Sequence, residues 1–212
     1  MIELHQVAFG YDPARATLEV PELRVDKGVT LVVGANGSGK STLLRLIAGV
    51  ERPRQGTITI DSFDLWRDGV QEVSARRLLA YVPEMPELTP YATVLEVLQL
   101  VASLRGAPVA AVVSALDRVG LFDLANRTVR ELSMGQRRRA MLATALVGEP
   151  RVVILDEPLE TLDAEMRIFV RAWVAELRGR GATVLVATHD TAAFAEMTDF
   201  VLRVTAGRIM TE

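Results

Sequence analysis

The most constraining feature of this sequence is a glycine-rich segment, GANGSGKST at residues 34–42, between an apolar run and a helical pattern. The preceding TLVV predicts a buried strand, and the following KSTLLRLIAG predicts a helix that ends at Gly49. Glycines at this spacing let the backbone turn tightly, so that its N–H groups and the helix N-terminus form a site for anionic oxygens. This strand–loop–helix context argues against an incidental glycine-rich turn, and the Gly-x-Gly-x-x-Gly spacing of dinucleotide sites fits worse.

The side chains of this loop suit phosphate groups and a divalent cation. Lys40 supplies a positive charge for β- and γ-phosphates, and the Ser41 hydroxyl can ligate Mg2+. The residues of the loop that we expect to bind the phosphorylated ligand are Gly34, Asn36, Gly37, Ser38, Gly39, Lys40, Ser41 and Thr42.

The bulk composition describes an ordinary folded chain. Its 212 residues, half of them apolar and about a quarter charged, suit one domain with a substantial core. A net charge of -3 argues against nucleic acid as the main partner, and the lack of cysteine excludes disulfides and thiolate metal sites. The N-terminus, MIELHQVAFGY, predicts a strand and not a signal peptide. Because a spanning helix needs about 20 apolar residues, we expect no direct membrane insertion.

Strand and helix patterns alternate along most of the chain. Residues 1–33 predict strands separated by turn residues such as Asp12-Pro13, whereas residues 91–131 carry only helical patterns and predict an all-helical insertion. After it we expect a helix at 134–148, the strand VVIL, a helix at 163–178, the strand TVLVAT, a helix at 190–197 and two final strands. This alternation predicts a parallel sheet with helices on its faces.

Two acidic residues, Asp156 and Glu157, follow directly on the apolar strand VVIL. Ligands of open α/β sheets bind at the carboxyl ends of the strands. Asp156 therefore suits a hold on Mg2+, and Glu157, outside the strand, suits the polarisation of an attacking water. The alternative is a solvated Asp-Glu-Pro turn.

The segment LSMGQRRR, residues 132–139, permits several interpretations. Ser133 and Gln136 form a capping box at a helix start, yet Gly135 lies inside that helix at a cost of about 1 kcal/mol. A basic patch for nucleic acid is excluded by geometry, because consecutive helical residues point about 100° apart. We expect the three arginines to pair with carboxylates or to cover the helix end.

Taken in order, the phosphate loop, LSMGQRRR, VVILDEP and VATHD resemble the ATP-binding subunit of ABC transporters over essentially the whole chain. LSMGQ is similar to that family's signature Leu-Ser-Gly-Gly-Gln, with Met134 replacing the first glycine. The resemblance implies an α/β fold with a P-loop NTPase core and a mostly parallel sheet. It also implies an N-terminal antiparallel β subdomain and an α-helical subdomain at about 85–131, all within one ATP-binding domain spanning 1–212.

The resemblance further implies hydrolysis of ATP by a head-to-tail dimer, in which the phosphate loop of one subunit and the signature of the other contact one nucleotide. On this basis Ser133, Gly135 and Gln136 serve the partner's ATP. The implied catalytic residues are Glu157, His189 and Lys40; the alternative for His189 is a satisfied side chain at a strand end.

Two further positions match the family, and each also has a purely structural interpretation. Tyr11 resembles the aromatic residue that stacks on adenine, and its alternative is a core aromatic. Asp163 resembles the residue that communicates across the dimer, and it could equally be only a helix N-cap.

One departure concerns Glu84 in YVPE, where the family generally has glutamine. A carboxylate there could ligate Mg2+ beside Ser41 and Asp156, or it could swing to solvent. We expect altered metal dependence with hydrolysis retained.

The family implies integral membrane permease subunits as partners, with the chain held peripherally at the cytoplasmic face of the membrane. A second ATP-binding subunit, identical or related, would complete the dimer. The alternative is a soluble ABC-type ATPase without a transport role, for example in iron–sulfur assembly.

Overall fold

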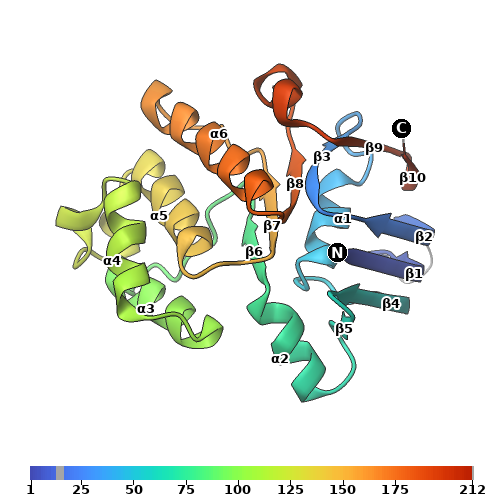
Figure 1. The fold of residues 1–212 in the computed structure, drawn as a ribbon, viewed down its shortest axis with the longest axis horizontal. Coiled ribbons are helices and arrows are strands. Elements are labelled where there is room, and N and C mark those ends of the chain that lie inside the picture. The colour runs from blue at the N-terminus through green and yellow to red at the C-terminus, as the bar shows by residue number, and fades with distance from the viewer. Residues whose placement is uncertain (13–16, 212) are drawn as a thin grey trace.

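The computed structural model describes residues 1–12 and 17–211, which form two sheets flanked by helices (Figure 1). Pro13, part of a predicted turn, lies outside the described residues. The larger sheet has the strand order β10-β9-β3-β8-β7-β6, and all its neighbours are parallel except β9 and β10. Its strands are β3 (Gly28–Val33), β6 (Leu79–Val82), β7 (Val152–Asp156), β8 (Thr183–Ala187), β9 (Phe200–Thr205) and β10 (Arg208–Thr211). The predicted mostly parallel sheet is confirmed.

The smaller sheet is antiparallel, with the order β2-β1-β4-β5, and confirms the predicted N-terminal β subdomain. Its strands are β1 (Ile2–Phe9), β2 (Leu18–Val25), β4 (Gln55–Ile60) and β5 (Phe63–Asp64). The strand β4 follows the phosphate loop in the sequence, so this sheet combines strands from both sides of the loop. The helix that follows the loop packs with this sheet in one apolar cluster.

The inserted segment is helical, as predicted, and Figure 1 shows α3, α4 and α5 together at one end of the molecule with β1, β2 and β4 at the other. The helices are α1 (Lys40–Ile47), α2 (Gly69–Arg77), α3 (Val94–Arg105), α4 (Val109–Arg118), α5 (Met134–Leu146) and α6 (Ala164–Gly179). Short 3-10 turns occur at Phe122–Leu124, Val129–Glu131 and Thr191–Met197. Within the described residues, none of the helices has both the length and the apolarity that crossing a bilayer requires.

The parallel sheet is buried on both faces, which explains the uninterrupted apolar runs of its central strands. Alternate residues of β7 point into different cores: Val153 and Leu155 pack with the helical insertion and α6, whereas Val152 and Ile154 pack with α1 and the antiparallel sheet. One face of the sheet thus packs into one apolar cluster, and the other face packs into the second.

The short strand β5 was not predicted, and two helical segments also differ from the sequence prediction. The helix α2 was not predicted, because it buries only Ala75 and has no apolar stripe; its start is fixed by Asp68, whose side chain accepts a hydrogen bond from Gln71 N at 3.0 Å. The predicted helix at 190–197 is a 3-10 turn, and Phe194 is its one buried side chain. Both lack the repeated apolar contacts that select a long helix.

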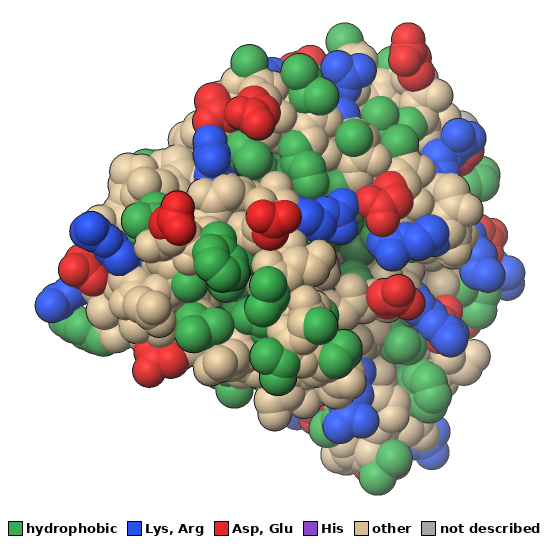
Figure 2. Space-filling model, turned by 60° about the vertical axis from the view of Figure 1, so that its left-hand side comes forward, with side chains coloured by type: hydrophobic (Ala, Val, Ile, Leu, Met, Phe, Trp, Pro, Cys, Tyr) green, Lys and Arg blue, Asp and Glu red, His purple; other side chains and the backbone are tan. Residues whose placement is uncertain are grey.

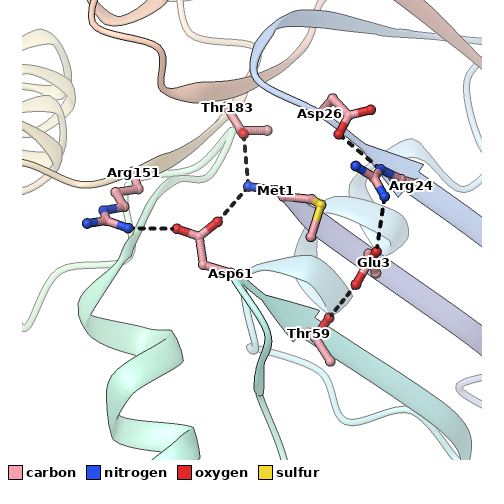
Figure 3. Close-up of polar contacts among 8 residues, drawn as sticks. All are labelled: Met1, Glu3, Arg24, Asp26, Thr59, Asp61, Arg151 and Thr183. Carbon is pink, nitrogen blue, oxygen red and sulfur yellow. Dashed lines mark hydrogen bonds and ion pairs between the residues drawn. The ribbon is translucent and has the colours of Figure 1, made fainter.

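The two sheets are joined by polar contacts around Asp61 (Figure 3). The Met1 amino group donates to Asp61 Oδ1 at 2.8 Å and to Thr183 Oγ1 at 3.3 Å, and Arg151 Nη1 lies 3.2 Å from Asp61 Oδ2. Partial burial opposes the charge on Asp61, but the hydrogen bonds from Met1 and Arg151 lower its pKa below the usual value. These contacts tie the end of β4 to the start of β7 and β8.

We predict that Asp199→Asn lowers the free energy of unfolding by about 1–2 kcal/mol at pH 7. Asp199 accepts hydrogen bonds from Val29 N at 2.9 Å and from Arg178 Nε at 2.8 Å, and thereby joins β3, α6 and the start of β9. The bond with Arg178, working against a small burial effect, lowers the pKa of Asp199. A lowered carboxyl pKa stabilises the fold fully above the unfolded value of 3.8, and this contribution is lost as the pH falls further.

Urea titrations between pH 3 and pH 7 measure this effect. The control is Asp26→Asn, which removes an exposed pair with Arg24 and should cost less than about 0.5 kcal/mol. Equal losses for the two variants at pH 7, or a difference that does not shrink below pH 4, would contradict the assignment.

Candidate functional site

The phosphate loop connects the end of β3 to the start of α1 and is folded tightly against β9. A Cβ at Gly34 would lie 2.2 Å from the Val204 carbonyl oxygen, so no larger residue fits this close approach. Gly39 is the N-cap of α1 with φ of 110°, a left-handed conformation that glycine adopts without strain. The loop thus presents its backbone and the positive end of α1 to one concave surface.

Lys40 lies within this concavity and is nearly buried. Its Nζ donates to the carbonyl oxygens of Gly34 at 2.9 Å and Ala35 at 3.2 Å. The ammonium group is therefore held over its own loop, where it can exchange carbonyl partners for phosphate oxygens.

The loop and the predicted carboxylates line one depression of about 340 Å³. Asp156 ends β7, Glu157 follows it, and Glu84 lies two residues after β6. Neighbouring parallel strands bring these residues to the same sheet edge. The described lining consists of Thr17, Asn36, Gly37, Gly39, Lys40, Ser41, Thr42, Glu84, Asp156, Glu157, Glu160 and His189.

The charge state of Asp156 reflects a crowded acidic corner. Burial raises the pKa of Asp156, and the charges of Glu84 and Glu157 raise it further, against a hydrogen bond from Ser41 and the charge of Lys40. A divalent cation would relieve this repulsion. Glu84 was predicted either to ligate Mg2+ or to turn to solvent. It is solvent-exposed and also lines the depression, so it has a feature of each placement.

The donor set fits a hydrated Mg2+ that is shared with phosphates. Within residues 1–12 and 17–211, no group of three or more His, Cys, Asp or Glu side chains is arranged to hold a metal ion. The Ser41 side chain lies near the buried Asp156 carboxylate, and both line the depression together with Glu84. Mg2+ typically takes one or two carboxylates and completes its octahedron with water and phosphate oxygens, which is what these residues leave open.

Glu157 occupies a strained backbone conformation with φ of 46°. Its N–H donates to the Ala187 carbonyl oxygen at 2.8 Å, and its Oε2 accepts from His189 N at 3.3 Å. The imidazole Nε2 of His189 lies 3.6 Å from Glu157 Oε1. Strained residues held in this way are characteristic of functional sites, and here the strain aims a buried carboxylate at the depression.

Tyr11 is not among the described residues that line the depression. Its ring meets Phe9 edge-on, with 5.0 Å between centroids, and its side chain lies near Arg45 of α1. The side chain is exposed, so the predicted stacking on adenine stays a prediction.

Three residues of the LSMGQ segment, Ser133, Gly135 and Gln136, line a second depression of about 250 Å³. Ser133 and Gln136 form the predicted capping box: Gln136 N donates to Ser133 Oγ at 3.3 Å, and Ser133 N donates to Gln136 Oε1 at 2.9 Å. Asp163 caps α6 by accepting from Met166 N at 2.9 Å, and it also pairs with Arg139. Its predicted capping role is confirmed.

The glycine in this segment is not required by packing within the chain. A Cβ at Gly135 would meet the Thr161 carbonyl oxygen at 3.6 Å, an ordinary contact, and φ of Gly135 is not positive. Neither packing nor backbone conformation within the chain therefore requires glycine at this position.

Three residues at or next to the first depression were not predicted from the sequence. Thr17 and Glu160 line the first depression, and Glu160 had no signal beyond its closeness to Glu157. Arg138, one of the three consecutive arginines, is fully buried behind the carboxylates. The almost entirely apolar run that follows the arginines in α5 was the one available indication of that burial.

Comparisons with known proteins identify relatives along most of this chain. A family model described as ABC transporter matches residues 19–160. The manganese transport system ATP-binding protein MntA of Synechocystis sp. is 35% identical over 210 residues, which cover 93% of this chain and 78% of that protein. The aliphatic sulfonates import ATP-binding protein SsuB of Albidiferax ferrireducens is 38% identical over 201 residues, with 92% and 68% covered.

Solved structures agree with the fold. The structure of an ATP-binding subunit of an ABC transporter has a TM-score of 0.87 at 29% identity and covers 99% of this chain and 89% of that chain. A dimeric post-hydrolysis structure of an ATP-binding cassette bound to ADP and Pi has a TM-score of 0.85 at 26% identity, with 100% and 98% covered. Motif order, architecture and relatives all agree with the predicted family, and this chain therefore belongs to the ABC transporter family.

Proposed function

We propose that this chain, as a single ATP-binding domain spanning residues 1–212, is the ATP-hydrolysing subunit of a transporter. It pairs with a second ATP-binding subunit and drives a separate membrane permease. The observation that carries the proposal is the division of anion-binding features between two separate depressions, one built on the phosphate loop and one on the LSMGQ segment. The relatives are named for transport, and a related cassette has been solved as a dimer with ADP and Pi.

The phosphate loop binds the triphosphate of ATP. Its backbone N–H groups and the positive end of α1 bind the phosphates, and the buried Lys40 supplies the fixed charge. Tyr11 is assigned to the adenine, because an exposed aromatic ring can stack on a base. Ser41 and Asp156 would hold Mg2+ together with phosphate oxygens, and Glu84 is within reach to bind it directly or through water. Bound Mg2+ neutralises charge that develops on the phosphates.

Glu157 acts on the water that attacks the γ-phosphorus. A new O–P bond forms, the bond to the β-phosphate oxygen breaks, and the products are ADP and inorganic phosphate. The proton of the water is taken up by the Glu157 carboxylate and returned to solvent or phosphate. His189, whose ring lies 3.6 Å from that carboxylate, keeps it oriented.

The second depression serves the partner subunit's ATP. Ser133 and the Gly135 N–H stand at the start of α5, a 13-residue helix whose N-terminus favours anions. A Cβ would find room at Gly135 in this chain, which supports the view that the glycine admits a ligand brought by another chain.

An apolar surface on the helical segment supports a permease as the further partner. Figure 2, which turns the left-hand side of Figure 1 forward, shows hydrophobic side chains gathered in the middle of this face among scattered charges. The exposed apolar residues in this part of the chain include Met85 and Tyr91 before α3, Leu100 and Leu104 on α3, and Val109 and Val113 on α4. Patches of this kind mark protein contacts, and the loop that carries Glu84 adjoins them. Docking on a permease would place the chain at the cytoplasmic face of the membrane.

We predict that Glu157→Gln lowers ATP turnover by about 1000-fold, because the amide cannot accept the proton from water. The change removes no phosphate contact, so ATP still binds and the variant should accumulate as an ATP-loaded dimer. Phosphate release measures turnover, and light scattering at high concentration with ATP and Mg2+ measures the mass. A variant that stays monomeric under these conditions, even with candidate partner chains supplied, would refute the proposed function.

We predict that Gly135→Ala raises the free energy of unfolding by up to about 1 kcal/mol and lowers ATP turnover by about 100-fold. The helix gains a better helix former, while the new methyl group blocks the approach of the partner's nucleotide. The matched control is Gly179→Ala on α6, where a Cβ meets nothing within 4 Å and turnover should stay unchanged. Unchanged turnover in Gly135→Ala would contradict a role in trans.

We predict that Glu84→Gln raises the Mg2+ concentration for half-maximal turnover by about 10-fold while hydrolysis is retained. The substitution removes one negative charge from the corner around Asp156 and hence some attraction for the cation. Glu87→Gln is the control, because Glu87 lies on the same loop but pairs with Arg45 at 3.1 Å. The idea fails if the Mg2+ dependence of Glu84→Gln matches that of the native chain.

A further inference from the structure

Arg138 is a fully buried arginine whose guanidinium contacts the two loops that carry Glu84 and Glu157. Its Nη1 donates to the carbonyl oxygens of Pro83 and of Glu84, the latter at 2.8 Å. Its Nη2 donates to the carbonyl oxygens of Asp156 at 3.0 Å and Glu157 at 2.5 Å. One side chain therefore satisfies four backbone acceptors directly behind the first depression.

These contacts begin where the pairing of β6 with β7 stops. That parallel pairing ends at Val82 and Leu155, and the four bonded carbonyls belong to the two residues that follow each of these positions. Before that last pair, sheet hydrogen bonds connect the two segments directly. Beyond it, the Arg138 guanidinium connects them. It sets the separation of the two loops at the point from which their carboxylates enter the depression.

Burying this charge is costly. Burial lowers the pKa of Arg138, against the nearby charges of Glu160, Asp156, Glu84 and Glu157. Its Nε atom has no hydrogen-bond partner among the described residues, so even the bonding capacity of the group is not fully used. A requirement for packing alone would be met better by an apolar side chain of similar volume.

We infer that Arg138 is a positioning residue for ATP hydrolysis: it holds Glu157 and Glu84 in register and joins them to the helix that begins at Ser133. The strained φ of Glu157 persists because the flanking bonds over-determine it, and Arg138 supplies one of these at its carbonyl. Arg138 lies in the second turn of α5, whose N-cap is Ser133. A displacement of this helix, when a partner's nucleotide engages its start, is thereby transmitted to the carboxylates of the same chain. This inference rests on the proposed function and deepens it.

Arg105 provides a matched comparison within the same chain. It is also a largely buried arginine, and it donates to the carbonyl oxygens of Thr144 at 2.6 Å, Val147 at 2.8 Å and Leu79 at 3.0 Å. These acceptors lie at the opposite end of α5 and at the start of β6. Arg105 thus does the same structural work without touching the loops of the site.

The experiment compares Arg138→Gln, Arg138→Lys and Arg105→Gln in the full chain. For Arg138→Gln we expect kcat to fall by about 100-fold, while KM and the ATP dissociation constant stay within about 2-fold, because the phosphate loop is untouched. Arg138→Lys keeps the charge and some donors, and should recover at least about 10-fold of the loss. Arg105→Gln should lower the melting temperature to a similar extent as Arg138→Gln but leave kcat per folded molecule unchanged.

Three results would overturn the inference. The first is an unchanged kcat in Arg138→Gln, and the second is an equal loss of kcat in Arg105→Gln. The third is failure of both Arg138 variants to fold while Arg105→Gln folds, since Arg138 would then hold the core and not the site. The proposed function is tested separately with the native chain. If the native chain binds no ATP or releases no phosphate, the proposed function is wrong. If the native chain hydrolyses ATP and any of the three results is found, only the role of Arg138 is wrong.

Discussion

The structure depends on the parallel pairing of β3, β8, β7 and β6, which brings four chemically different chain segments to one edge of the sheet. The residues that follow these strands are the phosphate loop after Val33, His189 after β8, Glu157 after β7 and Glu84 after β6. None of these segments is adjacent to another in sequence. Their meeting is a consequence of strand register, and the apolar packing on both faces of the sheet fixes that register.

The assembled edge is electrostatically unfavourable in the free chain. Glu84, Asp156 and Glu157 crowd around one buried lysine, and burial with this repulsion raises the pKa of Asp156. A strained residue and a buried guanidinium are added to the same corner. This combination reduces the free energy of unfolding of the chain, and a bound cation and phosphates can offset the loss. The site therefore favours ligand binding over the stability of the chain alone.

Both depressions contain polar groups that are hydrogen-bonded within the chain. Lys40 donates to its own loop, and Ser133 and Gln136 form reciprocal capping bonds. Binding must therefore exchange internal hydrogen bonds for bonds to phosphate, and the net gain per bond is modest. Two such half-sites acting on one nucleotide would give a larger total, which is a physical reason for the proposed completion of one chain's pocket by another.

The sequence by itself determined the features that depend on neighbours along the chain. The phosphate loop, the acidic pair after VVIL, the capping box at Ser133 and the N-cap at Asp163 are local patterns, and their order was sufficient to indicate the family. The alternation of strands and helices likewise fixed the parallel sheet and the helical insertion, because period and turn residues are local as well.

Only the tertiary structure decided which side chains meet across those elements. It placed Arg138 behind Glu84 and Glu157 and brought Thr17 into the depression. It also turned Tyr11 toward Phe9 and Arg45. The helix α2 was found only in the structure, because it is mostly exposed and its sequence has no helical repeat of apolar residues. Three consecutive arginines are indistinguishable in the sequence. The packing of α5 against the strand ends gave one of them carbonyl partners in the core and the other two partners nearer the surface, because a helix faces its surroundings in a different direction at each residue.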